Sequence, residues 1–421
     1  MIKVLNCKSK NYKKKLIDFL ELRRSGKTVD TTIVPRILKD IKKNKLKAVL
    51  KYEKLYSKNN KIKTSKKEIN QSIKNLDPKI KKAIDFAYSR IFKFHSLQKP
   101  RDIKYIDKYK NKLEYKYVPL QSVGCYVPQN LPSSLLMNCI PAQILGIKEV
   151  VVANPRINGK LDPAVMYAAK KCNVSEVITC GGSQAIGYLA YVKKVNKIIG
   201  PGNDYVVKAK QLVFGTVGTE GAITGPSEIC ILADNKTEIN DIGTSLVSQS
   251  EHGFESQSIL ITKHKDIINK VQKNITLNLQ NLPRKKIASR SLKKHGLIVI
   301  CQNDRQIIEV INEIAPEHLE LNINNYKKYL DKIINSGSIC VGKHSPMSAS
   351  DYTVGSSHVL PVYGTAKFSS GLNLREYVKS ISYINLSKKG IEKIGKYATP
   401  LAEYEELDCH AQSIKSRMRR K

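Results

Sequence analysis

Short runs of β-branched residues that lead into glycine turns constrain the fold of this chain most strongly. From Val123 onward, KEVVVANP, SEVITCGG, VNKIIGPGND and SEICILAD are such runs, and several lead directly into a helical stretch. A second set follows in SQSILITK, GLIVICQN and GSICVGK, with lysine-rich helical segments between them. Because strands that alternate with helices pair in parallel, the pattern predicts an α/β fold with two α/β domains.

The two ends of the chain have a different pattern. Residues from about 10 to 115 are lysine-rich, and in KKKLIDFLELRR and RILKDIKKNKLKAVLKYEKLY the apolar residues recur at spacings of three and four. This spacing predicts helices. After SSGLNLREY the chain becomes polar and helical again, and we expect one final helix through TPLAEYEELDCHAQSIKSRMRRK.

Length and composition set further limits. At 421 residues the chain is longer than a usual single domain, and 41% hydrophobic residues without any Trp predict a large aliphatic core. No apolar run approaches the roughly 20 residues of a membrane helix. The start, MIKVLNCKSKNYKKK, lacks the apolar centre of a signal peptide, so we expect a cytoplasmic protein without a membrane partner.

The charge is strongly positive. Seventy-three Lys and Arg residues against 36 Asp and Glu give a formal net charge of +37, which would suit a nucleic-acid-binding protein. The lysines, however, are spread over helical segments without an aromatic platform or a recognition motif. We therefore interpret them as solvated helix faces and expect no nucleic-acid partner.

Nine cysteines, an odd number without a close pair, argue against a disulfide framework and against a cysteine-based zinc site. Most of them lie in apolar runs and are expected to be small buried hydrophobic residues. Cys409 alone adjoins a histidine, but neighbouring side chains on a helix diverge, so a thiolate–imidazole pair is disfavoured.

A possible metal site begins at SQSEHGFESQ. Gln249 and His252 are three residues apart and share one helix face, so both can point at a single ion. Asp351 and His410 would have to complete the set from far along the chain. A lone Gln–His pair is more often an ordinary polar helix surface, and spacing alone leaves both readings open.

Glu317 and His318, in APEHLEL, form a different kind of pair. Adjacent side chains point in different directions, which does not suit a metal clamp. They suit two general bases that serve successive steps. An acid at a helix start after Pro316, beside a packed histidine, is the alternative.

Two glycine turns could receive an anionic ligand. GGSQAIGYLAY and IIGPGND each follow a predicted strand and lead into a helix, whose backbone N–H groups can bind a phosphate. Neither is a complete GxGxxG fingerprint, and the chain has no GxxxxGK[ST] sequence. Ordinary strand-to-helix turns remain the alternative.

Taken together and in order, these segments resemble the histidinol dehydrogenase family, and the resemblance covers nearly the whole chain. It implies two Rossmann-like α/β domains with small helical N- and C-terminal pieces that complete an intertwined homodimer. The matching segments are VGCYVP (123–128), LPSSLLM (131–137), GGSQAIGYLAY (181–191), GPGNDYV (200–206), GPSEICILAD (225–234), QSEHG (249–253), APEHLEL (315–321), SDYTVGSSHVLP (350–361) and EELDCH (405–410).

The resemblance also implies a division into domains. Residues 1–22 would be the small N-terminal helical piece. Residues 23–124 and 229–372 would form the first α/β domain, with the zinc and the catalytic residues. Residues 125–228 would form the NAD-binding domain, and residues 373–421 the dimer-swapped piece.

The activity implied is zinc-dependent oxidation of L-histidinol to L-histidine through L-histidinal, with two NAD+ reduced, in the last steps of histidine biosynthesis. One Zn2+ per subunit would be held by Gln249, His252, Asp351 and the partner subunit's His410. His318 would take the alcohol proton, and Glu317 would activate water for attack on the aldehyde. The remaining implied contacts are Tyr126, Gln184 and Asn203 to NAD+, and Ser227, His358, Glu405, His318 and the four metal ligands to the substrate.

The chain departs from the family pattern in two places. YVPQNLPSS is shorter than the usual loop and lacks its glycine pair, and Thr219–Glu220 stands where many members have a hydrophobic residue and Asp. A dehydrogenase for another amino alcohol and a nucleic-acid-binding protein are the competing hypotheses.

Overall fold

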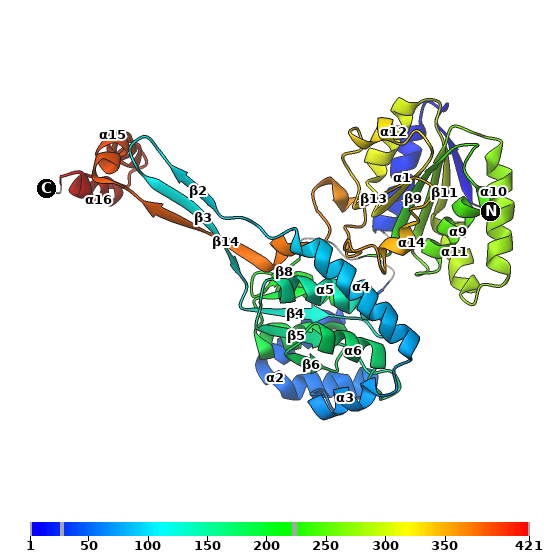
Figure 1. Cartoon of the computed structure of the whole chain (residues 1–421), viewed down its shortest axis with the longest axis horizontal. Helices are drawn as coiled ribbons and strands as arrows, with labels where there is room; N and C mark the ends of the chain where they lie inside the picture. The colour runs from blue at the N-terminus through cyan, green and yellow to red at the C-terminus, as the bar shows by residue number, and fades with distance from the viewer. Residues whose placement is uncertain (1, 26–28, 221–224, 420–421) are drawn as a thin grey trace. The chain divides into compact units, whose positions relative to one another are not determined.

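The computed structural model describes residues 2–25, 29–220 and 225–419 (Figure 1). The chain folds as two compact units. The main unit comprises Met1–Gln98 and Gln121–Glu376, and the tail unit comprises Lys99–Leu120 and Tyr377–Lys421. No described helix is long and apolar enough to cross a membrane.

One lobe of the main unit is built on a six-stranded parallel sheet with the order β1-β11-β10-β9-β12-β13. Alternate residues of its strands enter two separate cores: Cys230 and Leu232 pack on one face, and Ile229 and Ile231 on the other. The strands are β1 (Lys3–Asn6), β9 (Glu228–Ala233), β10 (Gln257–Thr262), β11 (Gly296–Ile300), β12 (His318–Asn322) and β13 (Ser338–Val341). The helices are α1 (Tyr12–Ser25), α9 (Ile239–Ser250), α10 (Ile267–Gln280), α11 (Lys285–His295), α12 (Asp304–Ile314), α13 (Lys327–Leu330) and α14 (Met347–Ser350).

The other lobe of the main unit is built on a five-stranded parallel sheet with the order β6-β5-β4-β7-β8. Its strands are β4 (Ser122–Tyr126), β5 (Glu149–Ala153), β6 (Glu176–Ile178), β7 (Lys197–Ile199) and β8 (Gly218–Thr219). Its helices are α2 (Ile33–Ser57), α3 (Lys66–Ile73), α4 (Pro78–Ser96), α5 (Pro132–Ile144), α6 (Pro163–Lys171), α7 (Gly182–Gly187), a π-helical turn (Tyr188–Lys193) and α8 (Asp204–Val213).

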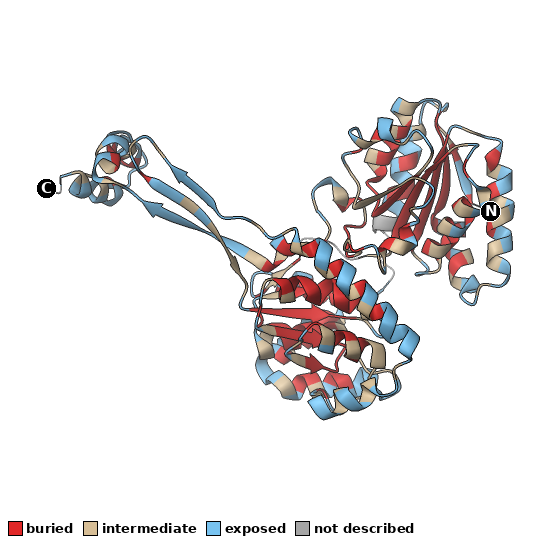
Figure 2. Ribbon diagram, viewed as in Figure 1, coloured by how far each residue is buried: buried red, intermediate tan, exposed pale blue. Residues whose placement is uncertain are grey.

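The two sheets share one strand topology. Apart from the added edge strand β1, each sheet begins at a central strand (β9 or β4), continues with two strands on one side of it and ends with two strands on the other. Figure 2 shows that the central strands of both sheets are buried. The α/β fold with parallel sheets that the sequence predicted is thereby confirmed.

The N-terminal helices pack differently from the division that the resemblance implied. That division placed residues 23–124 with residues 229–372. In the structure, the apolar face of α2, with Val34, Ile37 and Ile41, shares a core with Ile178 and Ile198 of the five-stranded sheet. The chain start is not purely helical either, because β1 forms the edge of the six-stranded sheet.

The tail unit is a three-stranded antiparallel sheet followed by two helices. The sheet has the order β14-β3-β2, with strands β2 (Ile103–Ile106), β3 (Lys112–Pro119) and β14 (Val378–Asn385). The helices are α15 (Lys388–Tyr404) and α16 (Asp408–Met418), and two short 3₁₀ turns, Thr365–Lys367 and Leu374–Tyr377, precede β14 in the chain.

These strands correct the prediction of helix up to residue 115, and the two terminal helices correct the prediction of one. KLEYKY in β3 and SISY in β14 alternate polar with apolar residues, a period-two pattern that the abundant lysines obscure. Between α15 and α16, Glu406 has a φ of +59°, which ends the first helix.

The cysteines match the expectation of small buried residues. Seven of the nine are buried, Cys340 is half-buried and Cys409 is exposed, and all nine are free thiols.

Candidate functional site

A cavity of about 490 Å³ lies at the amino-terminal ends of β9 and β12. The parallel register explains why distant residues meet there, because His318 at the start of β12 pairs with Ile229 in β9 and with Ser338 in β13. Ser227 directly precedes β9, and Glu317 directly precedes β12. The predicted residues that line the cavity are Tyr126, Asn203, Ser227, Gln249, His252, Glu317, His318, Asp351 and His358.

Gln249 lies in the last turn of α9 and is only 1% exposed. Neither polar atom of its side-chain amide has a hydrogen-bond partner among the described residues. A buried amide without a partner costs free energy, so its presence points to a ligand. His252 follows directly, with its backbone N–H bonded to the Gln249 carbonyl (3.2 Å). Desolvation by surrounding protein atoms, together with Arg284, lowers the pKa of His252.

His318 is buried beside two carboxylates. Its Nε2 lies 3.7 Å from Oδ1 of Asp351 and 4.0 Å from Oε1 of Glu317, while its Nδ1 is 3.0 Å from Oγ of Ser338. Burial, followed by His358 and His252, lowers the pKa of His318 to about 3. The imidazole is therefore neutral near pH 7, which is the form that can accept a proton.

Glu317 is held in a reciprocal backbone arrangement with Glu228. Oε2 of Glu317 accepts a hydrogen bond from the Glu228 N–H (2.7 Å), and Oε2 of Glu228 accepts one from the Glu317 N–H (3.3 Å). Oε1 of Glu228 accepts a third bond from the Tyr363 N–H (2.7 Å). One oxygen of Glu317 is thus anchored, and the other lies on the side of His318.

His358 joins the Asp351 loop to α5. Its Nδ1 donates to the backbone carbonyl of Asp351 (2.7 Å), so its Nε2 accepts from the hydroxyl of Ser134 (3.3 Å). Burial lowers the pKa of His358 and raises that of Asp351 to about 7. A nearby cation would strongly stabilise the ionised form of the Asp351 carboxyl group.

A second cavity, of about 510 Å³, lies at the carboxyl ends of β4 and β7 in the five-stranded lobe. It is lined by all three predicted NAD residues, Tyr126, Gln184 and Asn203. The strand order reverses between β4 and β7, and ligands of open α/β sheets bind at such a point. Tyr126, Pro128 and Asn203 also line the first cavity, so the two cavities meet at these residues.

The glycine turns of the second cavity are held by buried polar groups. The Tyr126 hydroxyl accepts from the Gly182 N–H (3.3 Å), and burial raises the pKa of Tyr126 to about 12. In the other turn, Glu220 accepts from the Gly200 N–H (3.1 Å) and pairs with the buried Lys210. Glu220, which stands where many family members have Asp, therefore fixes this turn.

Several residues around the cavities were missed by sequence reasoning. Glu228 had a weak signal, because it belongs to the GPSE segment that was already noted. Ser338 lies at a strand start, and Tyr56 and Ser57 lie on a lysine-rich helix without any functional pattern. Only the packing of the helix on the sheet brings the last two to the cavity.

Glu405 and His410 are not among the described residues that line either cavity. Glu405 ends α15 and His410 lies in the first turn of α16, so both belong to the tail unit, and both are exposed.

The residues in the main unit fit a divalent metal ion in part. Within the described residues, no three His, Cys, Asp or Glu side chains gather closely enough to hold a metal. Gln249, His252 and Asp351 nevertheless offer an amide oxygen, an imidazole nitrogen and a carboxylate oxygen to one cavity. The buried amide of Gln249 and the buried carboxyl of Asp351 both gain from a cation, and this donor set suits zinc with a further ligand.

Comparisons with known proteins agree with one another. Residues 22–418 match the family model described as histidinol dehydrogenase. The chain is 52% identical to histidinol dehydrogenase of Pelagibacter ubique (strain HTCC1062) over 428 residues, which covers all of both chains. It is 35% identical to the enzyme of that name from Acinetobacter baylyi (strain ATCC 33305 / BD413 / ADP1), with 99% of this chain and 100% of that one covered.

Solved structures give the same result. The crystal structure of histidinol dehydrogenase from Elizabethkingia anophelis superposes with a TM-score of 0.93 at 33% identity, covering 99% of this chain and 98% of that one. An indole-3-acetaldehyde dehydrogenase, at 12% identity and a TM-score of 0.50, covering 89% of this chain and 87% of that one, shares the fold alone. The resemblance found in the sequence is confirmed, and the chain belongs to the histidinol dehydrogenase family of NAD-dependent oxidoreductases.

Proposed function

We propose that this protein oxidises L-histidinol to L-histidine through L-histidinal and reduces two NAD+ per turnover, as the last steps of histidine biosynthesis. The observation that carries the proposal is the meeting of two cavities at Tyr126, Pro128 and Asn203. A dinucleotide in the second cavity would place its nicotinamide end beside a substrate in the first, and hydride transfer requires this proximity.

The substrate would be oriented by a zinc ion held by Gln249, His252, Asp351 and the partner subunit's His410. When bound, such an ion would supply a Lewis acid that orients the substrate in the first cavity. The isolated amide of Gln249 and the mixed donor set support this assignment.

The first oxidation would use His318 as the base. Its neutral Nε2 accepts the hydroxyl proton of histidinol while the C–H hydrogen leaves as hydride to NAD+, and the alcohol becomes the aldehyde. Ser338 at Nδ1 holds the ring in place, so the nitrogen beside Glu317 and Asp351 faces the substrate cavity. Ser227 and His358 line the same cavity and would contact the substrate.

The second oxidation would use Glu317. Its Oε1, on the side of His318, would remove a proton from water as the water attacks the aldehyde, which gives the hydrate as its anion. This anion would then lose hydride to a second NAD+, which gives the carboxylic acid, and the acid would release its proton to solvent as the carboxylate forms. Because the aldehyde stays in the cavity between the steps, side reactions are avoided.

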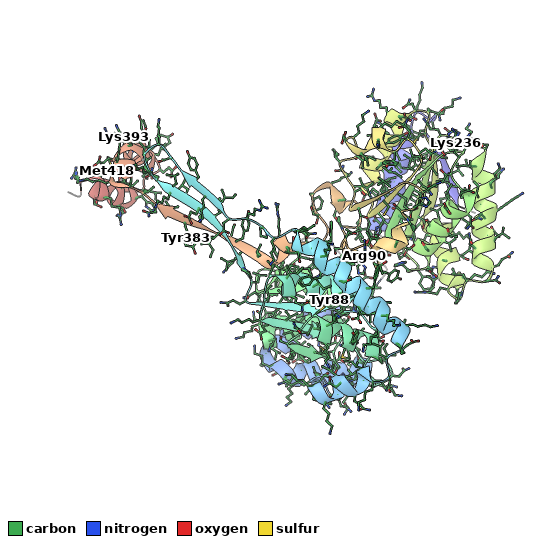
Figure 3. The ribbon with its side chains drawn as sticks, in the orientation of Figure 1. Tyr88, Arg90, Lys236, Tyr383, Lys393 and Met418 are labelled. Carbon is green, nitrogen blue, oxygen red and sulfur yellow. The ribbon has the colours of Figure 1, made fainter. Side chains whose placement is uncertain are left out.

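The proposal includes an intertwined homodimer in which the tail unit of one chain serves the site of the other, with Glu405 contacting substrate. The tail strands support it, because they expose Tyr105, Tyr115, Ile381 and Tyr383 (Figures 2 and 3). A three-stranded sheet with so many exposed apolar side chains is stabilised when another chain covers it.

The test is NADH formation by the purified protein with L-histidinol, measured together with its metal content. We expect two NADH per histidinol consumed, roughly stoichiometric zinc, loss of activity with a chelator and recovery with Zn2+. Other L-amino alcohols are the control. Equal rates with those alcohols would contradict the histidinol assignment, and a metal-free active enzyme would contradict the zinc site.

A further inference from the structure

A buried acid that the proposed mechanism does not use lies near the C-terminal end of α2. Glu53 is 1% exposed, although it lies on a helix whose other charged residues are mostly lysines at the surface. Its Oε1 accepts hydrogen bonds from the Gly181 backbone N–H (2.8 Å) and from Nε2 of Gln184 (2.8 Å). Both partners belong to the glycine turn that lines the second cavity.

This position is unfavourable for a carboxylate in isolation. Burial raises the pKa of Glu53, and the C-terminal end of a helix repels negative charge. Two donors converge on one oxygen, and Nδ2 of Asn59 lies 3.5 Å from the other. The role of Glu53 therefore lies in its hydrogen bonds to Gly181 and Gln184.

The carboxylate fixes which way the Gln184 amide points. An ionised carboxylate only accepts hydrogen bonds, so the NH2 end of the amide must face Glu53, and the oxygen must face away. That oxygen lies over the turn, since it is 3.0 Å from the point that a Cβ on Gly182 would occupy. Gly182 has a φ of +56°, so a side chain there would be strained as well as crowded.

An amide oxygen in this orientation selects a hydrogen-bond donor. The phosphates of a dinucleotide only accept, whereas its ribose hydroxyls and amino groups donate. Gln184 lines the second cavity and does not line the first, which places it away from the reacting carbon. Its contact is therefore with the body of the cofactor.

We propose that Glu53 is a positioning residue for the cofactor. It locks the turn from Gly181 to Gln184 and presents the Gln184 amide oxygen to a ribose hydroxyl or amino group of NAD+. This inference rests on the proposed function, because it takes NAD+ to be the occupant of the second cavity.

The test is Glu53→Gln, which keeps the size of the side chain and an acceptor for the Gly181 N–H, but no longer dictates the orientation of the Gln184 amide. The measurements are calorimetric binding of NAD+ and steady-state kinetics. We expect Kd and KM for NAD+ to rise about tenfold, with a much smaller change in kcat at saturating NAD+ and in KM for histidinol. Glu149→Gln is the matched control, because Glu149 pairs with Lys193 at the surface of the same lobe and lines neither cavity.

The outcomes separate the two hypotheses. If wild-type protein binds no NAD+, the proposed function fails. If the wild type binds NAD+ and Glu53→Gln binds it equally well, the positioning role is overturned and the proposed function stands. A loss of kcat that matches the loss in NAD+ affinity, with a lowered melting temperature, would make Glu53 a general structural residue and would also overturn the inference.

Discussion

At the scale of single residues, the proposed chemistry depends on how the side chains of Glu317 and His318 are held. His318 is kept neutral by burial, with Ser338 at one nitrogen and carboxylates near the other. Glu317 is anchored through one oxygen by the Glu228 backbone. Neighbours in sequence thus acquire different surroundings, which is what two bases for two different steps require.

Glu317→Gln is expected to slow histidinal oxidation about a hundredfold or more, with a smaller effect on histidinol oxidation to the aldehyde. The amide keeps the acceptor for the Glu228 N–H but cannot take a proton from water. Single-turnover formation of NADH from each substrate measures the two steps separately. Oxidation of histidinal at the wild-type rate would show that Glu317 is not the base.

The loop Tyr126–Ser134 also depends on a single residue. Asn130 has a φ of +50°, in the left-handed region where glycine is favoured and asparagine is tolerated best among other residues. The loop can therefore make its turn without the glycine pair that is usual in the family. Gln129, next to it, is tied to the Arg156 carbonyl (2.6 Å) and lines the second cavity.

At the scale of elements, the two sheets share a topology but have their cavities at different ends of the strands. In the five-stranded lobe the point between β4 and β7 opens into a cavity that reaches Tyr126. At the corresponding point of the six-stranded lobe, between β9 and β12, the Thr237 hydroxyl donates to the Asn322 carbonyl (2.6 Å) and bridges the strand ends. The polar residues around it, such as Lys236 (Figure 3), surround a separate cavity of about 480 Å³. The candidate site of the six-stranded lobe lies instead at the amino-terminal ends of its strands.

The carboxylate of Glu68 caps the start of helix α3 and ties this helix to Lys61 and Arg156. Glu68 forms a capping box with Ser65 and pairs with Lys61 (2.8 Å) and Arg156 (3.1 Å). Hydrogen bonding from Lys61 is the largest of the effects that lower the pKa of Glu68, which falls to about 2. Because the folded-state pKa is depressed, this stabilisation is complete above the unfolded-state pKa of ~4.3 and is lost as the pH falls toward 2.

Glu68→Gln is expected to lower the free energy of unfolding by about 1 kcal/mol at pH 7, and by progressively less as the pH falls from about 5 to 3. Urea unfolding at several pH values measures the difference. Glu313→Gln, which removes a single surface ion pair with Lys367, is the control and should have a smaller effect. A difference for Glu68→Gln that does not change with pH would contradict the ionic explanation.

At the scale of the whole molecule, the proposed site needs residues from both units of the chain. Gln249, His252 and Asp351 lie in the main unit, whereas Glu405 and His410 lie in the tail unit. Within the main unit, the C-terminal part of α4 is tied to the Asp351 region, since Arg90 donates to the carbonyls of Thr353 (2.7 Å) and Val354 (3.1 Å) (Figure 3). These hydrogen bonds hold the loop that follows Asp351 against a helix that packs on the five-stranded lobe.

A mixture of two inactive variants tests the shared site. Chains with His410→Ala and chains with His318→Ala are each expected to be inactive as homodimers. After unfolding and refolding together, about half of the dimers would be mixed, and each of these would have one site with both histidines intact. We expect about a quarter of the wild-type activity per chain under such random pairing. Absence of activity in a mixture that has formed mixed dimers would show that His410 serves its own chain.

By itself, the sequence determined the α/β class, the buried cysteines and the family, because strand–turn–helix periodicity and nine matching segments are local properties that survive in the order of residues. It did not reveal β2, β3 and β14, where lysines obscure a period-two pattern, and the grouping of α2 with the five-stranded sheet differs from the division that it implied. Only the tertiary structure brought Gln249, Glu317 and Asp351 to one cavity and Glu53 to the Gln184 turn. Parallel strand register and helix packing set these contacts, and both depend on residues far apart in the chain.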